Sequence, residues 1–523
     1  MELEKLLKME QAANKGRREM FRLGTALLFL VGIILFISMR GGEVNYALMV
    51  AAMIGGYMAL NIGANDVANN IGPAVGSKAL TLTGALFIAA IFEASGAIIA
   101  GGDVVSTIKS GIINPDAVAD PNTFIWLMTA ALLAGALWLN IATAAGAPVS
   151  TTHSIVGGVL GAGVAAGGLG IANWGEVGQI VASWVISPLL GGVIAAGFLY
   201  LIKRTITYKP DMLQAARQMV PVLLMVMAWA FSTYLVMKGL KQIWKVGFGT
   251  AVMIGIGFAL TTYALTRPWV ASVSARVENT KQGVNSLFTL PLIFAAALLS
   301  FAHGANDVAN AVGPLAAINE AIEHGAVAAK AAIPLWVLLV GAIGIALGLA
   351  LYGPKLIKTV GSGITELDQM RAFCIAMAAA ITVILASQLG LPVSSTHVAV
   401  GAVFGVGFLR EFLKAHYGRM IETIEEHHVG HDREIVEAYL EKFRAADFEE
   451  KGAMLTQLKA SKQAAAESHL SKKERKGLRN IYRQELVKRS ALMRIVAAWL
   501  ITVPVSALMA AMLFFTIRGM MLP

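Results

Sequence analysis

Two copies of one polar sequence lie inside otherwise apolar stretches of the chain. Both read Gly-Ala-Asn-Asp-Val-Ala-Asn, the first over residues 63–69 and the second over residues 304–310. A lone aspartate at the middle of a membrane costs about 2.5 to 3.5 kcal/mol on insertion scales. Because packing needs no ionisable group in lipid, a pair of aspartates at matching places predicts a binding site for an ion or a substrate. The polar side chains of the two copies are Asn65, Asp66, Asn69, Asn306, Asp307 and Asn310.

These side chains have the chemistry of a site for a hard cation. Aspartate provides anionic oxygens, and asparagine both donates and accepts hydrogen bonds. Hard cations such as Na⁺ favour oxygen ligands. Backbone N–H and C=O groups in lipid must be hydrogen-bonded, so a polar break inside an apolar run is tolerated only where it lines a cavity or is buried in protein. We therefore expect each copy to interrupt its helix with an unwound segment, line a cavity and offer backbone carbonyl oxygens. Glu93 lies in another apolar run and is predicted to be a cation ligand or a proton carrier. The predicted ligands of a coupled ion are Asp66, Asn69, Glu93, Asp307 and Asn310.

A second motif follows each polar copy. Residues 148–153 read Pro-Val-Ser-Thr-Thr-His, and residues 392–397 read Pro-Val-Ser-Ser-Thr-His. Proline is favoured in a first helical turn and Ser or Thr caps free N–H groups, so each motif predicts the start of a helix. Such a helix end binds an anion without Arg or Lys. We expect two re-entrant hairpins, 148–169 and 391–409, whose tips donate hydrogen bonds to a bound anion.

The hairpins complete the predicted substrate site. Together with the aspartates and asparagines above, its hydroxyl donors are Ser150, Thr151, Thr152, Ser394, Ser395 and Thr396. His153 and His397 follow these donors directly, and each is either part of a proton relay or a neutral histidine that is hydrogen-bonded within its hairpin.

The nearly equal spacing of the two motifs in the two halves shows an internal duplication. If the halves have opposite orientations in the membrane, as in many secondary transporters, the motifs meet near the midplane. The predicted fold is an all-α polytopic membrane protein of two inverted repeats with broken helices, re-entrant hairpins and a helical cytoplasmic insertion. The predicted segments are an N-terminal tail and first helix (1–43), repeat 1 (44–202), connecting loops and helices (203–285), repeat 2 (286–409), the insertion (410–489) and a C-terminal helix (490–523).

The composition agrees with a membrane protein and excludes a soluble enzyme. The 523 residues are 57% hydrophobic and 14% charged, which suits a chain of many spanning helices. Apolar runs of spanning length occur at 24–39, 46–60, 79–101, 123–142, 177–202, 219–237, 246–266, 286–302, 331–352, 370–389 and 491–516.

The formal charge of +10 follows from basic cytoplasmic loops, so no nucleic-acid partner is predicted. Basic residues before the first apolar run place the N-terminus in the cytoplasm. Residues 410–489 are charged and lack a spanning run, and their basic end indicates a cytoplasmic location near anionic lipid. A multi-pass protein of the cell inner (plasma) membrane is expected, with a homo-oligomer left open. The basic residues of the N-terminal tail are Lys5, Lys8, Lys15, Arg17, Arg18 and Arg22.

At these four motifs the chain resembles the PiT family of inorganic phosphate transporters, whose signature is a Gly-Ala-Asn-Asp-Val-Ala-Asn segment in each of two inverted repeats. The likeness covers residues 44–200 and 286–410. The resemblance implies cation-coupled import of inorganic phosphate by alternating access, with Asp66 and Asp307 at the cation and substrate site. It implies no cofactor, and Na⁺ enters only as a co-transported ion, with no further metal.

One position departs from the family pattern. Many sodium-coupled eukaryotic relatives have a glutamate in the segment that leads to the second hairpin, where this chain reads Phe-Cys-Ile-Ala-Met over residues 373–377. Ala376 cannot bind Na⁺ through its side chain, so the sequence leaves Na⁺ and H⁺ open as the coupling ion.

Two other functions are weighed against phosphate symport. A sulfate permease of the same fold is the nearer alternative, because a helix-end site binds either tetrahedral anion. An intramembrane aspartyl protease is the remote one, since its paired carboxylates share a proton. Each aspartate here lies among asparagines and is followed by a Ser/Thr hairpin, which suits binding rather than the activation of water. No enzyme and no catalytic residue are therefore predicted.

Overall fold

The computed structural model describes the helical core of the protein. Described are residues 2–40, 45–118, 120–147, 149–239, 246–325, 333–363, 367–413, 431–445 and 489–521, with isolated positions between 450 and 474. Pro148 and most of the predicted insertion 410–489 lie outside the described residues. The predicted segment boundaries stay predictions.

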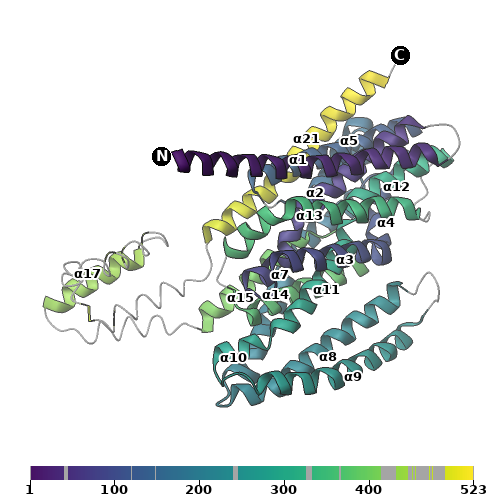
Figure 1. Ribbon diagram of the computed structural model, residues 1–523. Helices are drawn as coiled ribbons and strands as arrows, with labels where there is room; N and C mark the ends of the chain where they lie inside the picture. Colours follow the sequence, from purple (N-terminus) through teal and green to yellow (C-terminus); the bar gives the residue numbers. More distant parts are fainter. Residues whose placement is uncertain are drawn as a thin grey trace.

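The described residues form helices joined by short loops (Figure 1). The helices up to residue 207 are α1 (Glu2–Met39), α2 (Tyr46–Gly76), α3 (Leu82–Ala100), α4 (Gly102–Ser110), η1 (Pro115–Ala117), α5 (Pro121–Ala145), α6 (Thr151–Gly167), η2 (Leu169–Ile171), α7 (Trp174–Ile202) and the π-helical turn η3 (Lys203–Thr207). Those that follow are α8 (Met212–Gly239), α9 (Phe248–Ser274), α10 (Lys281–Ser286), α11 (Thr289–Asp307), α12 (Ala309–His324), α13 (Leu335–Gly363), α14 (Gln369–Gln388), α15 (Ser395–Leu413), α17 (His431–Ala445) and α21 (Arg489–Met521).

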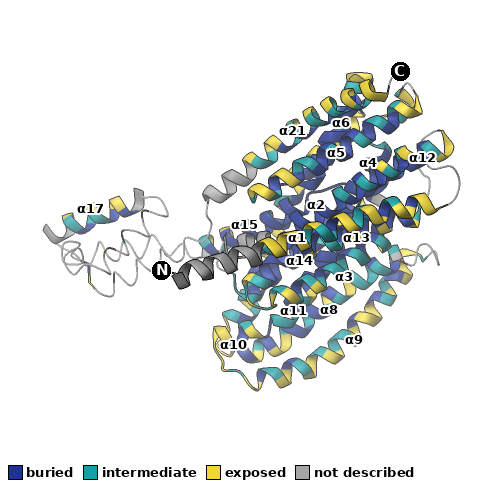
Figure 2. Cartoon of the chain, turned by 45° about the horizontal axis from the view of Figure 1, so that its top comes forward, coloured by how far each residue is buried: buried dark blue, intermediate teal, exposed yellow. Residues whose placement is uncertain are grey.

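The all-α membrane class is confirmed. Among the described residues, 11 helical segments are long and apolar enough to cross a membrane, and each predicted apolar run overlaps one of them. Helix α9 turns large apolar side chains outward, including Phe248, Phe258 and Leu265, as a lipid-facing helix does. Figure 2 shows the same gradient, with buried residues in the middle of the bundle and exposed ones along its outer helices.

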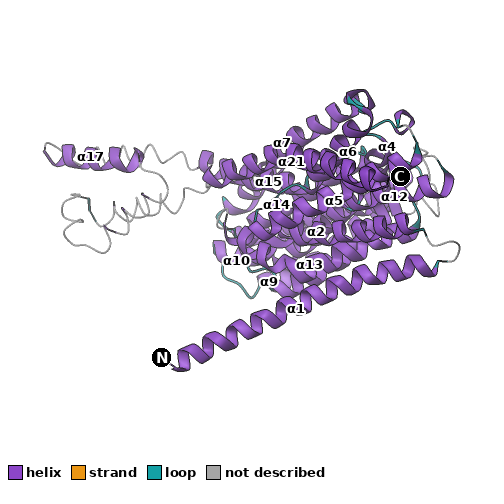
Figure 3. Ribbon diagram, turned by 90° about the horizontal axis from the view of Figure 1, so that it is seen from above, coloured by secondary structure: helices purple, strands orange, loops and turns teal. Residues whose placement is uncertain are grey.

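The two halves pack by exchanging helices. Helix α2 of the first half packs against α13 of the second, and α3 packs against α11. Likewise α6 packs against α21 while α7 packs against α15. Each half therefore completes its packing with helices of the other half, although their opposite membrane orientation stays a prediction. Figure 3 shows the bundle as purple helices joined by teal loops.

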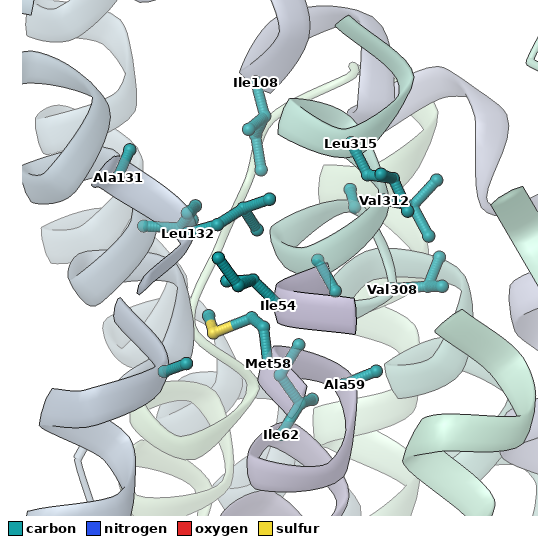
Figure 4. Packing of buried hydrophobic residues seen from close by; sticks show 14 of the residues in the cluster. Ile54, Met58, Ala59, Ile62, Ile108, Ala131, Leu132, Val308, Val312 and Leu315 are labelled. Atoms are coloured by element: carbon teal, nitrogen blue, oxygen red, sulfur yellow. The ribbon is translucent and has the colours of Figure 1, made fainter. Parts of the chain in front are cut away.

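A shared apolar core joins the halves around α2. Ile54, Met58 and Ile62 of α2 lie in one buried cluster with Ile108 of α4 and Val312 of α12. Figure 4 shows these side chains converging between the helices. Burial of a side chain of this size contributes about 1.5 to 3 kcal/mol, so the core fixes where α2 and α12 place their polar residues.

The first glycine of each polar copy is a close helix contact. A Cβ at Gly63 would lie 2.0 Å from the Ile345 carbonyl oxygen of α13, and one at Gly304 would lie 2.0 Å from the Glu93 carbonyl oxygen of α3. No real Cβ fits there, so these glycines let the backbones touch. Small residues allow such approaches in membrane helices.

We expect Gly304→Ala to lower stability by about 1–3 kcal/mol, because the new methyl group forces α11 away from α3. The measurement is the thermal unfolding midpoint of the purified protein in detergent. Gly197→Ala in α7 is the matched control, since a Cβ there meets no atom within 4 Å. An unchanged midpoint in Gly304→Ala would contradict the close contact.

A buried ion pair ties α4 to α12. Lys109 is 3% exposed and Glu320 is 6% exposed, and their side chains form a salt bridge. The sequence pattern did not indicate this pair. Beside it, the Thr107 hydroxyl donates to the Gly390 carbonyl oxygen at 2.7 Å, which joins α4 to the loop before α15.

Removing one partner of a buried ion pair leaves an uncompensated charge and costs about 3–5 kcal/mol. We therefore expect Lys109→Met to unfold at a markedly lower temperature than the wild type. The double variant Lys109→Met/Glu320→Leu should recover most of the loss, because no charge is then buried alone. Equal midpoints for the single and double variants would refute the pairing as a stabilising contact.

Candidate functional site

The expected unwinding of the polar copies is wrong for the first copy. Helix α2 runs without a break through residues 63–69. Only the second copy is interrupted, at Val308 between α11 and α12, and Val308 keeps right-handed helical angles. The backbone carbonyls stay mostly within the helices because the asparagine and aspartate side chains find partners on other helices. Side chains therefore make the site.

The predicted helix starts are confirmed. Helix α6 begins at Thr151, and the Ser150 hydroxyl accepts a hydrogen bond from the His153 N–H at 3.1 Å. Helix α15 begins at Ser395, and the Ser394 hydroxyl accepts from the His397 N–H at 3.3 Å. Ser150 and Ser394 thus cap their helices, which aims the next residues at the centre of the bundle.

Those next residues meet the polar copy of the opposite half. The Thr396 hydroxyl donates to Asp66 Oδ1 at 3.2 Å and accepts from Asn69 Nδ2 at 2.8 Å. All three side chains are 3% exposed or less. One helix start of the second half therefore contacts the aspartate of the first.

The reciprocal contact is also formed. The Thr151 hydroxyl donates to Asp307 Oδ1 at 3.0 Å, and the Thr152 hydroxyl lies 3.4 Å from the same oxygen. Asn310 Nδ2 reaches Asp307 Oδ1 at 3.0 Å and both threonine hydroxyls at 3.2 Å. Ser395 is buried in the first turn of α15. The site thus has the same construction twice, each time across the halves.

His303 joins the two constructions, and the sequence analysis missed it. Its Nε2 lies 3.5 Å from Asp307 Oδ2 and 3.7 Å from Asp66 Oδ2, while its Nδ1 lies 3.3 Å from Glu93 Oε2. The imidazole is fully buried. An available signal was the asymmetry of the repeats, because Ile62 stands just before the first copy where His303 stands before the second.

Glu93 belongs to the same cluster. Its Oε1 accepts from Asn70 Nδ2 at 2.8 Å, and its Oε2 faces His303. The carboxylates of Glu93, Asp66 and Asp307 are therefore connected through one imidazole ring and neighbouring amides. This supports the sequence-based grouping of Glu93 with the aspartates.

The cluster has the geometry of a cation site. Ligand atoms of Asp66, His303 and Asp307 all lie within 4.8 Å of one another. Asp66 Oδ2 and Asp307 Oδ2 are buried and make no hydrogen bond within the described part of the chain, and the same holds for Asn310 Oδ1. Buried anionic oxygens of this kind are costly unless a cation or a proton compensates them. The donor set therefore fits a small hard cation such as Na⁺.

Two predicted site residues make contacts beside the site. The Asn65 amide oxygen accepts from the Thr143 hydroxyl of α5 at 2.9 Å, and the Asn65 amide nitrogen donates to Asp66 Oδ1 at 3.2 Å. In the second half, Asn306 Nδ2 donates to the Ser387 hydroxyl of α14 at 3.0 Å. Asn65 and Asn306 therefore hold the polar copies against the helices that lead to α6 and α15, and they position the neighbouring aspartates.

His153 and His397 are the middle two of four aromatic rings that lie in a row, and they meet edge to face. His153 lies 3.8 Å from the ring of Trp184 and 4.4 Å from that of His397, and His397 lies 3.5 Å from the ring of Trp499. The rings come from α6, α7, α15 and α21, so the row spans the interface between the halves. The suggested proton relay stays a prediction, and the imidazole beside the carboxylates is that of His303.

Ala376 lies in the apolar core of the second half. It is fully buried beside Phe373 and Ile375 in one cluster. The segment that leads to α15 therefore contributes packing at this position and no ligand atom.

An all-helical membrane protein whose ionisable residues gather between exchanged halves has the construction of a secondary transporter. Residues 62–510 match the sequence model described as "Phosphate transporter family". The chain belongs to the phosphate transporter family, whose members are transporters and not enzymes.

Proteins of similar sequence or structure align with most of this chain. A protein named "Putative phosphate permease" from Helicobacter pylori strain J99 is 54% identical over 98% of both chains. One of the same description from Pyrococcus abyssi is 40% identical and covers 69% of this chain and 89% of its own. The solved structure named "The sodium-dependent phosphate transporter" is 33% identical, with a TM-score of 0.74 over 91% of this chain and 100% of its own.

Proposed function

We propose that this protein imports inorganic phosphate by symport with Na⁺ through alternating access. The observation that carries the proposal is the pair of reciprocal contacts in which the Thr396 hydroxyl donates to Asp66 and the Thr151 hydroxyl donates to Asp307. Hydroxyl groups that can donate to an anion and carboxylate oxygens that can bind a cation thus lie together at one buried place between the halves.

The phosphate would bind at the starts of α6 and α15. The hydroxyls of Thr151, Thr152, Ser395 and Thr396 lie there beside the positive ends of two helices, which bind a phosphate without Arg or Lys. Hydrogen phosphate also has a P–OH group that can donate a hydrogen bond to an aspartate, whereas sulfate at neutral pH has no proton to donate. A site whose acceptors need that proton rejects the analogue that lacks it. The substrate is therefore phosphate rather than sulfate.

The coupled Na⁺ would bind to the aspartates. Asp66 Oδ2, Asp307 Oδ2 and Asn310 Oδ1 make no hydrogen bond among the described residues, and His303 Nε2 lies beside the first two at 3.7 and 3.5 Å. A solved relative of the same fold is named as sodium-dependent. H⁺ is the second candidate for the coupled ion, because this chain has Ala376, which has no carboxylate, in the segment where many sodium-coupled eukaryotic relatives have a glutamate.

The exchange of helices supports the proposed alternating access. The site has one wall from each half, so a relative movement of the halves opens it to one side at a time. Basic residues in the N-terminal part of α1, such as Arg17 and Arg18, favour a cytoplasmic N-terminus in the plasma membrane. A homo-oligomer stays a prediction.

The test is uptake of labelled phosphate into proteoliposomes that carry the purified protein. An inward Na⁺ gradient, an inward H⁺ gradient or neither is imposed, with unlabelled sulfate or phosphate as competitor. We expect uptake with the Na⁺ gradient alone and competition by phosphate alone. Uptake with the H⁺ gradient alone would replace Na⁺ by H⁺. Accumulation of labelled sulfate without phosphate uptake would refute the proposed substrate.

A further inference from the structure

A second group of ionisable residues lies at one end of the bundle, away from the site described above. Lys203, Lys281, Arg371 and Arg410 all line a cavity of about 160 Å³, and Asp368 is the one acidic residue among the described residues of its lining. The four cations come from η3, α10, α14 and α15 respectively. Segments far apart in sequence are thus brought together with an excess of positive charge.

The cavity is a built site rather than a patch of surface lysines. Arg410 is only 7% exposed. Lys203 begins the π-helical turn η3, and Thr207 of the same turn also lines the cavity. Such turns are frequent at functional sites. On the opposite wall, Asn285 accepts from the Met370 N–H at 3.0 Å, which fixes α10 against the start of α14.

Asp368 is the one carboxylate among the described residues that line the cavity. Its Oδ2 pairs with Arg371 Nη2 at 2.8 Å, and its Oδ1 accepts from the Arg371 N–H at 2.9 Å. Both of its oxygens therefore contact Arg371. The charges of Arg410, Arg371 and Lys281 repel Lys203, while the carboxylate of Asp368 attracts it. Cations that repel one another around a small cavity are stabilised by an anion that bridges them.

We propose that this cavity binds a phosphate group at a site separate from the transport site. Arginine forks match phosphate oxygens in pairs, and lysines add point charges. A volume of about 160 Å³ suits a small anion, since pockets for drug-sized ligands begin at about 300 Å³. The phosphate group belongs either to free inorganic phosphate or to a lipid headgroup, because the cavity lies where the spanning helices α7 and α14 end.

Its position links the cavity to the predicted insertion. Figure 1 shows α10 and α17 toward the same end of the bundle as the N-terminus, and Figure 3 agrees. Arg410 lies in the last turn of α15 and is the first residue of the predicted insertion. With the N-terminus in the cytoplasm, a phosphate group bound here is on the side at which imported phosphate arrives.

The test compares two double variants of the full-length protein. Lys203→Gln/Lys281→Gln removes two of the four cations of the cavity, neither of which is buried. Arg204→Gln/Lys209→Gln removes the same charge from exposed neighbours that do not line it. Both proteins are first checked for a single species in gel filtration. Binding of labelled inorganic phosphate is then measured by equilibrium dialysis.

Thermal unfolding is also followed in vesicles of phosphatidylcholine, alone or with about one tenth phosphatidate. If the ligand is free phosphate, the dissociation constant of one phosphate-binding component rises at least about tenfold in Lys203→Gln/Lys281→Gln and not in the other double variant. If the ligand is a lipid headgroup, phosphate binding in dialysis is the same in both variants, but in Lys203→Gln/Lys281→Gln alone phosphatidate no longer raises the unfolding temperature. If the two double variants behave alike in both measurements, the proposal is refuted.

Discussion

Asp307→Asn is expected to abolish phosphate uptake, lowering the initial rate at least about 100-fold, while the protein still folds. Asp307 Oδ1 accepts from Thr151 and Asn310, and Oδ2 lies 3.5 Å from His303 Nε2. Asparagine has the same shape, but one of its two terminal atoms is an NH₂ nitrogen that only donates. That nitrogen would face either the Thr151 and Asn310 donors or the place of the cation, and both contacts would be unfavourable. Losing one charge-assisted contact costs about 1.5–3 kcal/mol, and both substrate and ion depend on this carboxylate.

The measurement is the initial uptake rate in proteoliposomes under a Na⁺ gradient. Asp116→Asn, at an exposed position in η1, is the matched control and should transport as the wild type does. Asp66→Asn should behave like Asp307→Asn because each carboxylate accepts from a threonine of the other half and faces His303. Wild-type uptake in Asp307→Asn would remove this residue from the transport site.

His303→Leu is expected to abolish transport and also to destabilise the fold by about 3–5 kcal/mol, the range for removing one partner of a buried charged group. The imidazole is the contact shared by Glu93, Asp66 and Asp307. Without it, three buried carboxylates face one another across an apolar side chain, and like charges at short range repel. The readouts are the thermal unfolding midpoint and the initial uptake rate.

Two further variants separate structure from transport. Glu93→Gln combined with His303→Leu should recover part of the lost stability, because one of the facing charges is gone, but it should not recover uptake. His324→Leu, at an exposed position near the end of α12, serves as the control for loss of a histidine. Wild-type stability in His303→Leu would mean that the ring does not hold the carboxylates together.

The spanning helices and the helix starts were predictable because their causes are local. A run of apolar residues is long enough to cross lipid whatever surrounds it, and Ser150 and Ser394 cap N–H groups only three residues away. The polar copies were recognised for the same reason, since an aspartate in an apolar run is anomalous before any fold is known. The unwinding of the first copy was predicted wrongly, because the local pattern does not show that helical partners such as Thr396 satisfy Asn69 and Asp66.

Contacts between distant segments needed the tertiary structure. His303 precedes one copy of a motif, and only the packing of α11 against α3 brings it to Glu93. Lys109 and Glu320 are 211 positions apart in the numbering, and their pairing depends on α4 lying against α12.

The sequence by itself determined that this is a polytopic, duplicated membrane protein with two aspartates and two hydroxyl-rich helix starts, because hydropathy, repetition and capping are properties of short stretches. The tertiary structure decided that each helix start serves the aspartate of the other half, that His303 joins them, and that four cations meet at the end of the bundle. These arrangements arise from the exchange of helices between the halves, and no short stretch of sequence encodes which distant helix will be its neighbour.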